Sequence, residues 1–522
     1  MRKRIAILDY GSQYTHLIAR RIREKKVYSE VLPTSVTAAE LMTNPPLGII
    51  LSGGPASVFA EGAPQIDHAI FDLGIPVLGI CYGMQLMAHT LGGKVEPGAE
   101  REYGRAVLSI KEQASSSAEE TAGRTGIFAG LPASFTVWMS HGDRVAALPQ
   151  GFETAATSAN CPYAAMCDEK RRFYALQFHP EVVHSEHGSE ILANFVFGIC
   201  GAKPDWDMST WIDETVERMK KEIGNDEVVL GLSGGVDSSV VAVLLDKAIG
   251  KRLHCIFVDN GLLRKNEAAQ VERMFGEKLG LDLTVARAAE RFYAALDGVD
   301  EPEAKRKIIG REFIAVFAEE ARKFAHCRFL AQGTIYPDVI ESSAKPGNSQ
   351  TIKSHHNVGG LPPDLKFELV EPLRDLFKDE VRSVGRLLGM DAELLDRQPF
   401  PGPGLGVRIL GEITAEKVRL LQEADARVQE EVKKLPNYKS IWQTFAVLLP
   451  CRSVGVMGDQ RTYEYTCVIR SVDSIDAMTA DWTRLPYDTL ATISSRIINE
   501  VRGINRVVYD ISSKPPATIE WE

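Results

Sequence analysis

The chain has 522 residues, of which 44% are hydrophobic and 25% are charged, and its formal net charge is -10 at pH 7. This length exceeds what one hydrophobic core usually serves and predicts two to four domains. The negative charge argues against binding to nucleic acid by bulk electrostatics, although a local basic cluster could still hold a small anion. We therefore expect no nucleic-acid partner.

Cysteine usage and hydropathy indicate the cellular environment. The eight cysteines contain no C-x-x-C pair, so neither a disulfide scaffold nor a zinc ribbon is predicted. The apolar run at Ile5–Leu8 is too short for the core of a signal peptide, and no apolar run reaches about 18 residues. These features predict a soluble, cytoplasmic enzyme without a membrane partner.

The first 200 residues alternate short apolar runs with helical patterns. The runs lie at Ile5–Leu8, Gly48–Leu51 and Pro76–Ile80. This alternation predicts an α/β sheet whose strands are buried on both faces. Around residues 200–208 the sequence changes to glycine, proline and acidic residues, which predicts a domain boundary.

A second α/β series follows this boundary, with strands predicted at Glu227–Leu230, His254–Val258 and Arg328–Ala331. It ends at RQPFPGPGLG, residues 397–406, where proline and glycine exclude a helix or an interior strand. The third region is β-rich, with runs at Tyr465–Ile469 and Arg506–Ile511 and a helix from about Pro486 to Val501. We predict two α/β open-sheet domains, 1–204 and 205–396, and a smaller α+β domain, 397–522.

A cysteine follows the strand predicted at Pro76–Ile80 and precedes a helix-like segment. The sequence there is GICYG, residues 79–83, so Cys81 lies between two glycines at a strand-to-helix turn. A nucleophile elbow has this arrangement, and the N-terminus of the helix favours the reactive thiolate. A lone cysteine is more often a small buried hydrophobe, so the prediction of a nucleophile depends on partner residues.

Those partners are predicted in two other segments. His179 and Glu181 follow the apolar run Phe173–Phe178, and on a continuing strand they would project to the same side. Glu181 would then orient the ring of His179, which would act as the base for Cys81. A turn reading SGGP follows the strand at Gly48–Leu51. We expect an oxyanion site there, with backbone N–H donors from Gly53, Gly54 and Tyr82.

Together, these three motifs resemble a class I glutamine amidotransferase domain of the triad type, over about residues 1–200. The resemblance implies hydrolysis of glutamine to glutamate and ammonia, with a glutamyl thioester on Cys81 and with His179 as general base and acid. It also implies that Gln85 and Asp143 contact the substrate glutamine. Asp143 is equally well explained as a turn residue.

The second α/β series begins with a serine- and glycine-rich turn, LSGGVDSS at residues 232–239. It lacks the lysine of the Walker A pattern, so ordinary γ-phosphoryl transfer is not predicted. Asp237 can face a phosphate only through a cation, which predicts Mg²⁺. Hydroxyl and backbone N–H donors for a phosphate are expected from Ser233, Gly234, Gly235, Val236, Ser238 and Ser239.

The segment SGGVDSS resembles the loop of the N-type ATP pyrophosphatases. The resemblance implies that ATP is cleaved between its α- and β-phosphates, that the acceptor is adenylated, and that the loop holds the leaving pyrophosphate. It also implies that the backbone of Val258 contacts adenine. We further expect Gly333, which follows a predicted strand, to belong to the ATP site, and Lys353 to offset charge on the α-phosphate during adenylation.

Two segments of the third region, RQPFPGPGLG and the terminal SKPPATIEWE, resemble the C-terminal domain of the GMP synthetases. With both upstream domains in order, this resemblance covers essentially the whole chain. It implies small-molecule substrates, namely glutamine, ATP and xanthosine 5′-monophosphate (XMP). The C2 oxygen of XMP would be adenylated, and ammonia would then displace AMP.

Lys514 lies in a proline-rich, and therefore rigid, stretch where its ammonium can meet the phosphate of XMP. The resemblance implies further XMP contacts at Arg311, Arg397, Gln443, Thr518, Ile519 and Glu520. It also implies that the third domain pairs two subunits, so we expect a homodimer.

Two other functions are compatible with parts of the sequence. One is another glutamine-dependent adenylating ligase, such as NAD synthetase, in which the terminal KPPATIEWE has no evident role. The other is a regulatory protein that binds glutamine or a nucleotide at inactive sites. The intact set of Cys81, His179, Glu181 and Asp237 argues against this second alternative.

Overall fold

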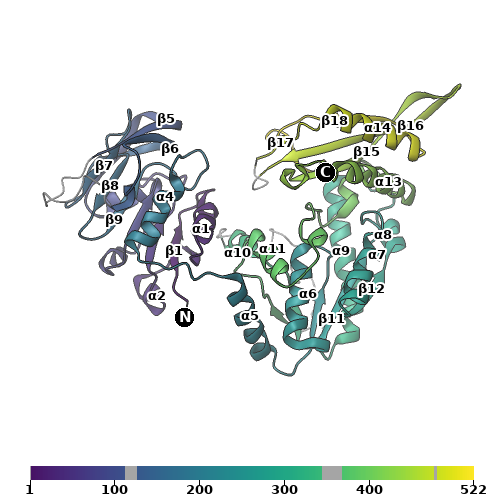
Figure 1. Cartoon of the computed structure of the whole chain (residues 1–522), viewed down its shortest axis with the longest axis horizontal. Helices are drawn as coiled ribbons and strands as arrows, with labels where there is room; N and C mark the ends of the chain where they lie inside the picture. The colour runs from purple at the N-terminus through teal and green to yellow at the C-terminus, as the bar shows by residue number, and fades with distance from the viewer. Residues whose placement is uncertain (1, 112–125, 344–366, 475–478) are drawn as a thin grey trace. The chain divides into compact units, whose positions relative to one another are not determined.

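The computed structural model describes residues 2–111, 126–343, 367–474 and 479–522 (Figure 1). The chain divides into two compact units, which are considered separately. Unit 1 comprises Met1–Asp207 with Pro337–Gly347, and unit 2 comprises Met208–Tyr336 with Asn348–Glu522. Apart from residues 205–207 and 337–347, the segments predicted as the second and third domains thus lie in one compact unit. None of the helices in the described part of the chain is long and apolar enough to cross a membrane.

The described residues of unit 1 form a nine-stranded sheet in the order β2-β1-β3-β4-β9-β8-β7-β5-β6. The half from β2 to β9 is parallel, and the half from β9 to β6 is antiparallel. The strands are β1 (Ile5–Asp9), β2 (Ser29–Pro33), β3 (Gly48–Leu51), β4 (Val77–Ile80), β5 (Lys94–Ile110), β6 (Ser134–Ala147), β7 (Glu153–Thr157), β8 (Ala165–Asp168) and β9 (Phe173–Leu176).

The parallel half confirms the predicted α/β architecture. Every residue of β3, β4 and β9 is buried, which is why these strands are continuous apolar runs in the sequence. The antiparallel half was not predicted, because β6 alternates in burial and β7 and β8 are short. The helices of this unit are α1 (Thr15–Arg23), α2 (Ala38–Thr43), α3 (Tyr82–Thr90) and α4 (Gly188–Ala193).

Unit 2 contains an all-parallel sheet, in the order β12-β11-β10-β13-β14 among its described residues. Its strands are β10 (Val228–Gly231), β11 (Leu253–Asp259), β12 (Asp282–Arg287), β13 (Phe329–Ala331) and β14 (Glu368–Val370). The associated helices are α5 (Met208–Ile223), α6 (Val236–Ile249), α7 (Glu267–Val271), α8 (Ala289–Ala295), α9 (Pro302–Ala321), α11 (Lys378–Leu387) and α12 (Ala392–Leu395); α10 spans Tyr336–Ser343.

The third predicted region forms a separate sheet within unit 2, shown in yellow-green in Figure 1. Its long antiparallel pair β15 and β16 is joined by β17 on one side and by β18, parallel to β16. Helices α13 and α14 pack on this sheet and against each other. The bounds are β15 (Gln443–Met457), β16 (Gln460–Asp473), β17 (Asp481–Trp482), β18 (Ile504–Asp510), α13 (Ala415–Val432) and α14 (Tyr487–Glu500).

Close packing fixes the turn that connects β4 to α3. A Cβ atom on Gly79 would lie 2.7 Å from the carbonyl oxygen of Gly83, and a Cβ atom on Gly83 would overlap the carbonyl of Leu51 in β3. The N–H of Gly83 also donates to the carbonyl of Ser52, at 3.1 Å. The helix can therefore approach the sheet this closely only because both positions lack a side chain.

We expect Gly83→Ala to destabilise the protein by about 1–3 kcal/mol, because the added methyl group must displace the backbone of a central strand. Urea denaturation, followed by circular dichroism, measures this change. Gly198→Ala is the matched control, since a Cβ atom at Gly198 meets open space. Equal stability of the two variants would contradict this account of the turn.

Candidate active sites

Cys81 occupies the turn between β4 and α3 with a strained backbone. Its φ angle is +52°, a region that side-chain-bearing residues rarely adopt, and it is the N-cap of α3. Its N–H donates to the carbonyl of Leu176 at 2.7 Å, and its side chain is 5% exposed. The Sγ atom lies 3.6 Å from the carbonyl oxygen of Ser140. The predicted elbow geometry is therefore present.

His179 and Glu181 are in direct contact, but not through the predicted strand. The Nδ1 atom of His179 lies 2.7 Å from Oε1 of Glu181, and both side chains are buried. Strand β9 ends at Leu176, so the two residues lie in the turn that follows it rather than on alternating positions of a strand. Because a carboxylate only accepts hydrogen bonds, Nδ1 donates to Glu181 and Nε2 is left for Cys81.

The electrostatics of this pair favour the imidazolium form of His179. Burial by itself lowers the pKa of His179, but the charge of Glu181 and hydrogen bonds with Cys81 and Glu181 outweigh burial. The pKa of His179 therefore lies well above its ordinary value. A protonated ring beside Cys81 stabilises a thiolate, so the pair is suited to nucleophilic catalysis.

The residues predicted for the oxyanion site surround this pair. A Cβ atom on Gly53 would lie 3.0 Å from the His179 ring and 3.6 Å from Cβ of Cys81. A Cβ atom on Gly54 would clash with the carbonyl oxygen of Tyr10. Tyr82 is the first residue of α3, so its N–H is one of the donors that a helix N-terminus leaves without an intrahelical partner.

Gln85 and Asp143 are also in contact. The side-chain amide of Gln85 donates to the carbonyl oxygen of Asp143 at 2.8 Å and lies 3.4 Å from the side chain of Gln177. The Oδ2 atom of Asp143 is buried and has no hydrogen-bond partner in the described part of the chain. Such an atom is costly unless a ligand satisfies it.

The SGGVDSS loop lies between β10 and α6, at the carboxyl edge of the parallel sheet. Its hydroxyls bond within the loop: Ser233 Oγ is 3.0 Å from Ser238 Oγ, and Ser239 donates to the carbonyl of Gly235 at 2.7 Å. Gly235 is the N-cap of α6, and Gly234 has a φ angle of +74°. The turn thus directs backbone N–H groups and a helix N-terminus toward one place, which is an anion-binding geometry.

Asp237 lies in the first turn of α6, and only one of its two carboxylate oxygens has a hydrogen-bond partner in the described residues. Its Oδ2 accepts from Nζ of Lys378, the first residue of α11, at 2.5 Å. Its Oδ1 is buried and is without a hydrogen-bond partner in the described residues. One carboxylate oxygen at a phosphate-type loop is therefore available to a hard cation.

Two other predicted ATP residues lie at the same edge of the sheet. Gly333 follows β13, and a Cβ atom there would lie 3.0 Å from the backbone nitrogen of Ser238. Val258 is the penultimate residue of β11 and is buried. Arg397, predicted to contact XMP, donates to the carbonyl of Gly234 in the loop at 3.3 Å. Lys353 lies outside the described residues.

The terminal segment of unit 2 is held by buried cations. Arg408 is fully buried and donates to both carboxylate oxygens of Glu520, at 3.1 and 2.9 Å. Gln443 donates to the same carboxylate at 2.8 Å. The fully buried Arg470 donates to the carbonyl of Thr518 at 3.0 Å.

Only some of the other residues that were predicted to contact XMP lie close to one another. Ile519 packs into a small core on the third sheet, and Lys514 forms an isolated β-bridge with Ala480. Together with Gln443, Thr518 and Glu520 they belong to one local region. Arg311 lies on α9, where 69% of its side chain is exposed and its guanidinium pairs with Glu312.

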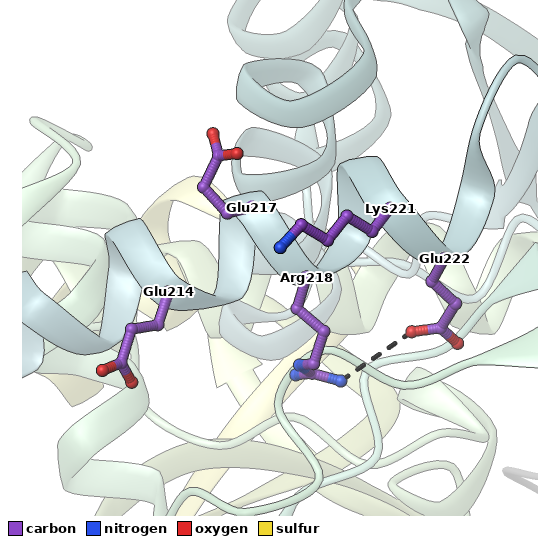
Figure 2. Close-up of a pocket in the computed structure, with 5 residues that line it drawn as sticks. All are labelled: Glu214, Glu217, Arg218, Lys221 and Glu222. Carbon is purple, nitrogen blue, oxygen red and sulfur yellow. Dashed lines mark ion pairs between the residues drawn. The ribbon is translucent and has the colours of Figure 1, made fainter.

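A shallow hollow on the surface of α5 has neither a nucleophile nor an anion-binding turn like those of the two candidate sites. Figure 2 shows that its lining side chains all come from one helix, α5, and the dashed line marks the Arg218–Glu222 pair at 4.0 Å. The full lining is Glu214, Glu217, Arg218, Lys221 and Glu222. These are charges along one helix, and we assign no role to them.

Several residues of these sites were missed in the sequence. Lys378 lies far from any recognised motif, whereas Gln177 and Arg408 lie only two residues from His179 and from the segment 397–406; each acquires its partner only through folding. The fully buried Lys305, which bonds Glu522, is of the same kind. A charged residue within an otherwise ordinary segment carries no local signal that its side chain will be buried.

Comparisons with known proteins match one family to unit 1 and two further families to unit 2. The family models that match are glutamine amidotransferase class-I over residues 6–199, NAD synthase over residues 208–315 and the GMP synthase C-terminal domain over residues 430–521. A glutamine-hydrolysing GMP synthase from Geobacillus kaustophilus is 57% identical over 518 residues, and one from Brachyspira hyodysenteriae is 55% identical over 519 residues. Each alignment covers 99% of both chains.

A solved glutamine amidotransferase from Thermotoga maritima aligns with 42% of this chain and 86% of its own, at 21% identity and a TM-score of 0.27.

The chain combines a cysteine elbow typical of glutaminases with a loop typical of ATP-binding sites. Together with these matches, this combination defines an ATP-using glutamine amidotransferase ligase. The chain belongs to the family of glutamine-hydrolysing GMP synthases, because relatives of that name match it at 55–57% identity over nearly all of their length. The alternative of an NAD synthetase is supported only by the match of one domain.

We expect Glu181→Gln to lower the pKa of His179, because burial would then oppose protonation without the carboxylate charge. The imidazolium would be lost at lower pH than in the wild type, and alkylation of Cys81 by iodoacetamide near pH 7 would slow. Titration of the ring by NMR measures the pKa. Glu181→Asp retains the charge and serves as the control. A ring that titrates unchanged in the glutamine variant would contradict this electrostatic account.

Proposed function

We propose that the chain aminates XMP to GMP in two coupled reactions, as a cytoplasmic enzyme. Glutamine is hydrolysed in unit 1, and the ammonia attacks an adenylated XMP in unit 2, which releases AMP and pyrophosphate. The observation that carries this proposal is the strained Cys81, with His179 and Glu181 2.7 Å apart beside it, in the same chain as a lysine-free ATP loop.

In the glutaminase reaction, the Cys81 thiolate attacks the side-chain amide carbon of glutamine. Backbone N–H groups of Gly53, Gly54 and Tyr82 stabilise the negative oxygen that develops. The imidazolium of His179 then gives its proton to the leaving ammonia, and a thioester remains on Cys81. His179 next takes a proton from a water molecule whose oxygen attacks the thioester carbon; the C–S bond then breaks, which releases glutamate and restores the Cys81 thiolate.

The substrate glutamine needs partners for its charged end. The unpaired Oδ2 of Asp143 is a fitting acceptor for the α-ammonium group, and Gln85 holds the backbone of Asp143 in place. Both residues therefore keep the role of glutamine contacts in the proposal. Because Gln85 donates to the backbone carbonyl of Asp143, a substitution at Gln85 would also disturb the position of Asp143.

In the adenylation reaction, the SGGVDSS loop holds the β- and γ-phosphates of ATP through its hydroxyl and N–H groups. The free Oδ1 of Asp237 fits Mg²⁺, which when bound offsets the charge between this carboxylate and the phosphates. Val258, near the end of β11, and Gly333, after β13, lie on either side of β10 and are proposed to flank the adenosine. Lys353 is proposed to offset charge on the α-phosphate as the C2 oxygen of XMP attacks it.

We place XMP beside the terminal segment of unit 2. Lys514 is proposed to bind its phosphate, and Gln443, Thr518, Ile519 and Glu520 are proposed to bind the remainder. The Arg408–Glu520 pair supports this assignment, because it fixes the position of the terminal segment against buried side chains of the same unit. Arg311 and Arg397 would complete the site.

Replacing the two key side chains should have reciprocal effects. Cys81→Ala should abolish GMP formation from glutamine but retain formation from added ammonium, because the adenylation site is intact. Asp237→Asn should abolish GMP formation from either nitrogen source and retain a Cys81 that iodoacetamide alkylates. Chromatographic separation of GMP from XMP, with ATP and Mg²⁺ present, measures both.

Cys451→Ala is the control, since this exposed cysteine lies in neither site. Loss of ammonium-dependent synthesis in Cys81→Ala would show that the two reactions do not occur at separate sites. An enzyme that consumes ATP with another acceptor, and leaves XMP unchanged, would contradict the substrate.

We also propose that the third region pairs two chains. An apolar face on the β15–β16 pair supports this, with Val454 61%, Val456 73% and Tyr463 63% exposed. Residues 454 and 463 are cross-strand partners, and residue 456 lies on the same face. Exposed apolar surface of this kind commonly marks an interface.

The double variant Val456→Glu/Tyr463→Glu should be a monomer, because burying two carboxylates in an interface is strongly unfavourable. Light scattering after size-exclusion chromatography measures the mass of each form. The double variant Gln65→Glu/Asn160→Glu, at exposed positions of unit 1, controls for added charge. A wild-type protein with the mass of one chain would exclude the homodimer.

A further inference from the structure

Four side chains with metal-binding atoms converge at the amino-terminal edge of the parallel sheet of unit 2. Glu227 immediately precedes β10, His254 lies at the start of β11, and His326 and Cys327 precede β13. Their ligand atoms all lie within 4.8 Å of one another. The SGGVDSS loop lies at the carboxyl ends of the same strands, so this cluster is separate from the proposed ATP site.

The cluster is centred on one carboxylate oxygen. Oε2 of Glu227 lies 2.7 Å from Nε2 of His326, 3.0 Å from Nε2 of His254 and 3.8 Å from Sγ of Cys327. Three side chains from two separate segments thus point at a single acceptor. A cation among them would satisfy the same four atoms at once.

A second carboxylate orients one of the histidines. Asp282 Oδ2 lies 2.5 Å from Nδ1 of His254, so Nδ1 carries the hydrogen of that bond. In a neutral ring, Nε2 is then a lone pair, and it faces the lone pairs of Glu227. That arrangement is repulsive unless a proton or a metal ion lies between them. A carboxylate that holds the far nitrogen of a histidine is also the usual outer partner of a metal-binding histidine.

The set of donors determines which cation fits. Two imidazoles, a thiol and a carboxylate are ligands of Zn²⁺, whereas Mg²⁺ and Ca²⁺ prefer oxygen alone. Around a tetrahedral Zn²⁺ these atoms would be about 3.4–3.8 Å apart. The distances in the structure include values both shorter and longer than this range. Side-chain rotations that move the ligand atoms by about an ångström are therefore enough to reach tetrahedral geometry.

The exposure of the side chains also allows an ion to enter and leave the cluster. The side chain of His326 is 61% exposed, whereas that of His254 is 14% exposed and Cys327 is buried. An ion can therefore enter from the side of His326, with His254 and Cys327 already in place. His254 is further fixed by stacking on Phe324, with ring centroids 4.7 Å apart.

We propose that Glu227, His254, His326 and Cys327 bind Zn²⁺ or a similar borderline divalent cation, with Asp282 orienting His254. The ion joins the starts of three neighbouring strands, β10, β11 and β13, and thereby stabilises the sheet from the edge opposite the ATP loop. The site has no part in the proposed reaction.

Cobalt substitution of the chelator-treated, full-length protein tests this site. Co²⁺ should give the ligand-field bands of a tetrahedral complex and a near-ultraviolet charge-transfer band from thiolate to cobalt. His326→Ala should lower Zn²⁺ affinity at least about 100-fold, measured by competition with a chromophoric chelator, and Asp282→Asn should lower it about 10- to 100-fold. Cys327→Ser should abolish the charge-transfer band.

His68→Ala and Cys451→Ser are the matched controls, because both replace exposed residues outside the cluster. His326→Ala replaces a largely exposed side chain, so it keeps the test valid even if Cys327→Ser fails to fold. Zn²⁺ should also raise the midpoint of thermal unfolding in the wild type but not in His326→Ala. A wild-type protein without the charge-transfer band, or a band that persists in Cys327→Ser, would overturn the proposal. So would equal Zn²⁺ affinity in His326→Ala and the wild type.

Discussion

Both candidate active sites depend on one backbone constraint, namely that a buried parallel strand must turn directly into a helix that packs on its own sheet. At β4–α3 this is possible because Gly79 and Gly83 have no side chain and Cys81 accepts a φ angle of +52°. At β10–α6 it is possible because Gly234 adopts a φ angle of +74°. The same turn that permits close packing exposes the helix N-terminus, where nucleophiles and phosphates are stabilised.

Buried charged side chains are stabilised differently in the two units. In unit 1 a buried carboxylate, Glu181, raises the pKa of His179 and so favours an ion pair with the nucleophile. In unit 2 the fully buried guanidiniums of Arg408 and Arg470 bind a terminal segment that has little apolar surface of its own. Buried cations are unfavourable without partners, so that segment and its acceptors must fold together.

The sequence predicted the parallel strands well, because burial on both faces requires continuous apolar runs such as Gly48–Leu51. It did not predict β6, whose alternating burial is also compatible with loops and edge strands, or the short strands β7 and β8. It predicted contact between His179 and Glu181 for the wrong local reason, since the strand ends before them at Leu176. Lys378 and the Glu227–His254–His326–Cys327 cluster were not predicted, because their members come from separate segments.

The sequence by itself determined the chemistry of the two turns and the order of the domains, because each turn is a contiguous motif whose glycines and reactive side chains act within a few residues. It also determined the family, through similarity along nearly the whole chain. Only the tertiary structure decided which charges meet: Lys378 with Asp237, Arg408 with Glu520, and Arg397 with the ATP loop. Those contacts join residues more than 100 positions apart, and no local pattern records which distant carboxylate or carbonyl a buried cation will reach.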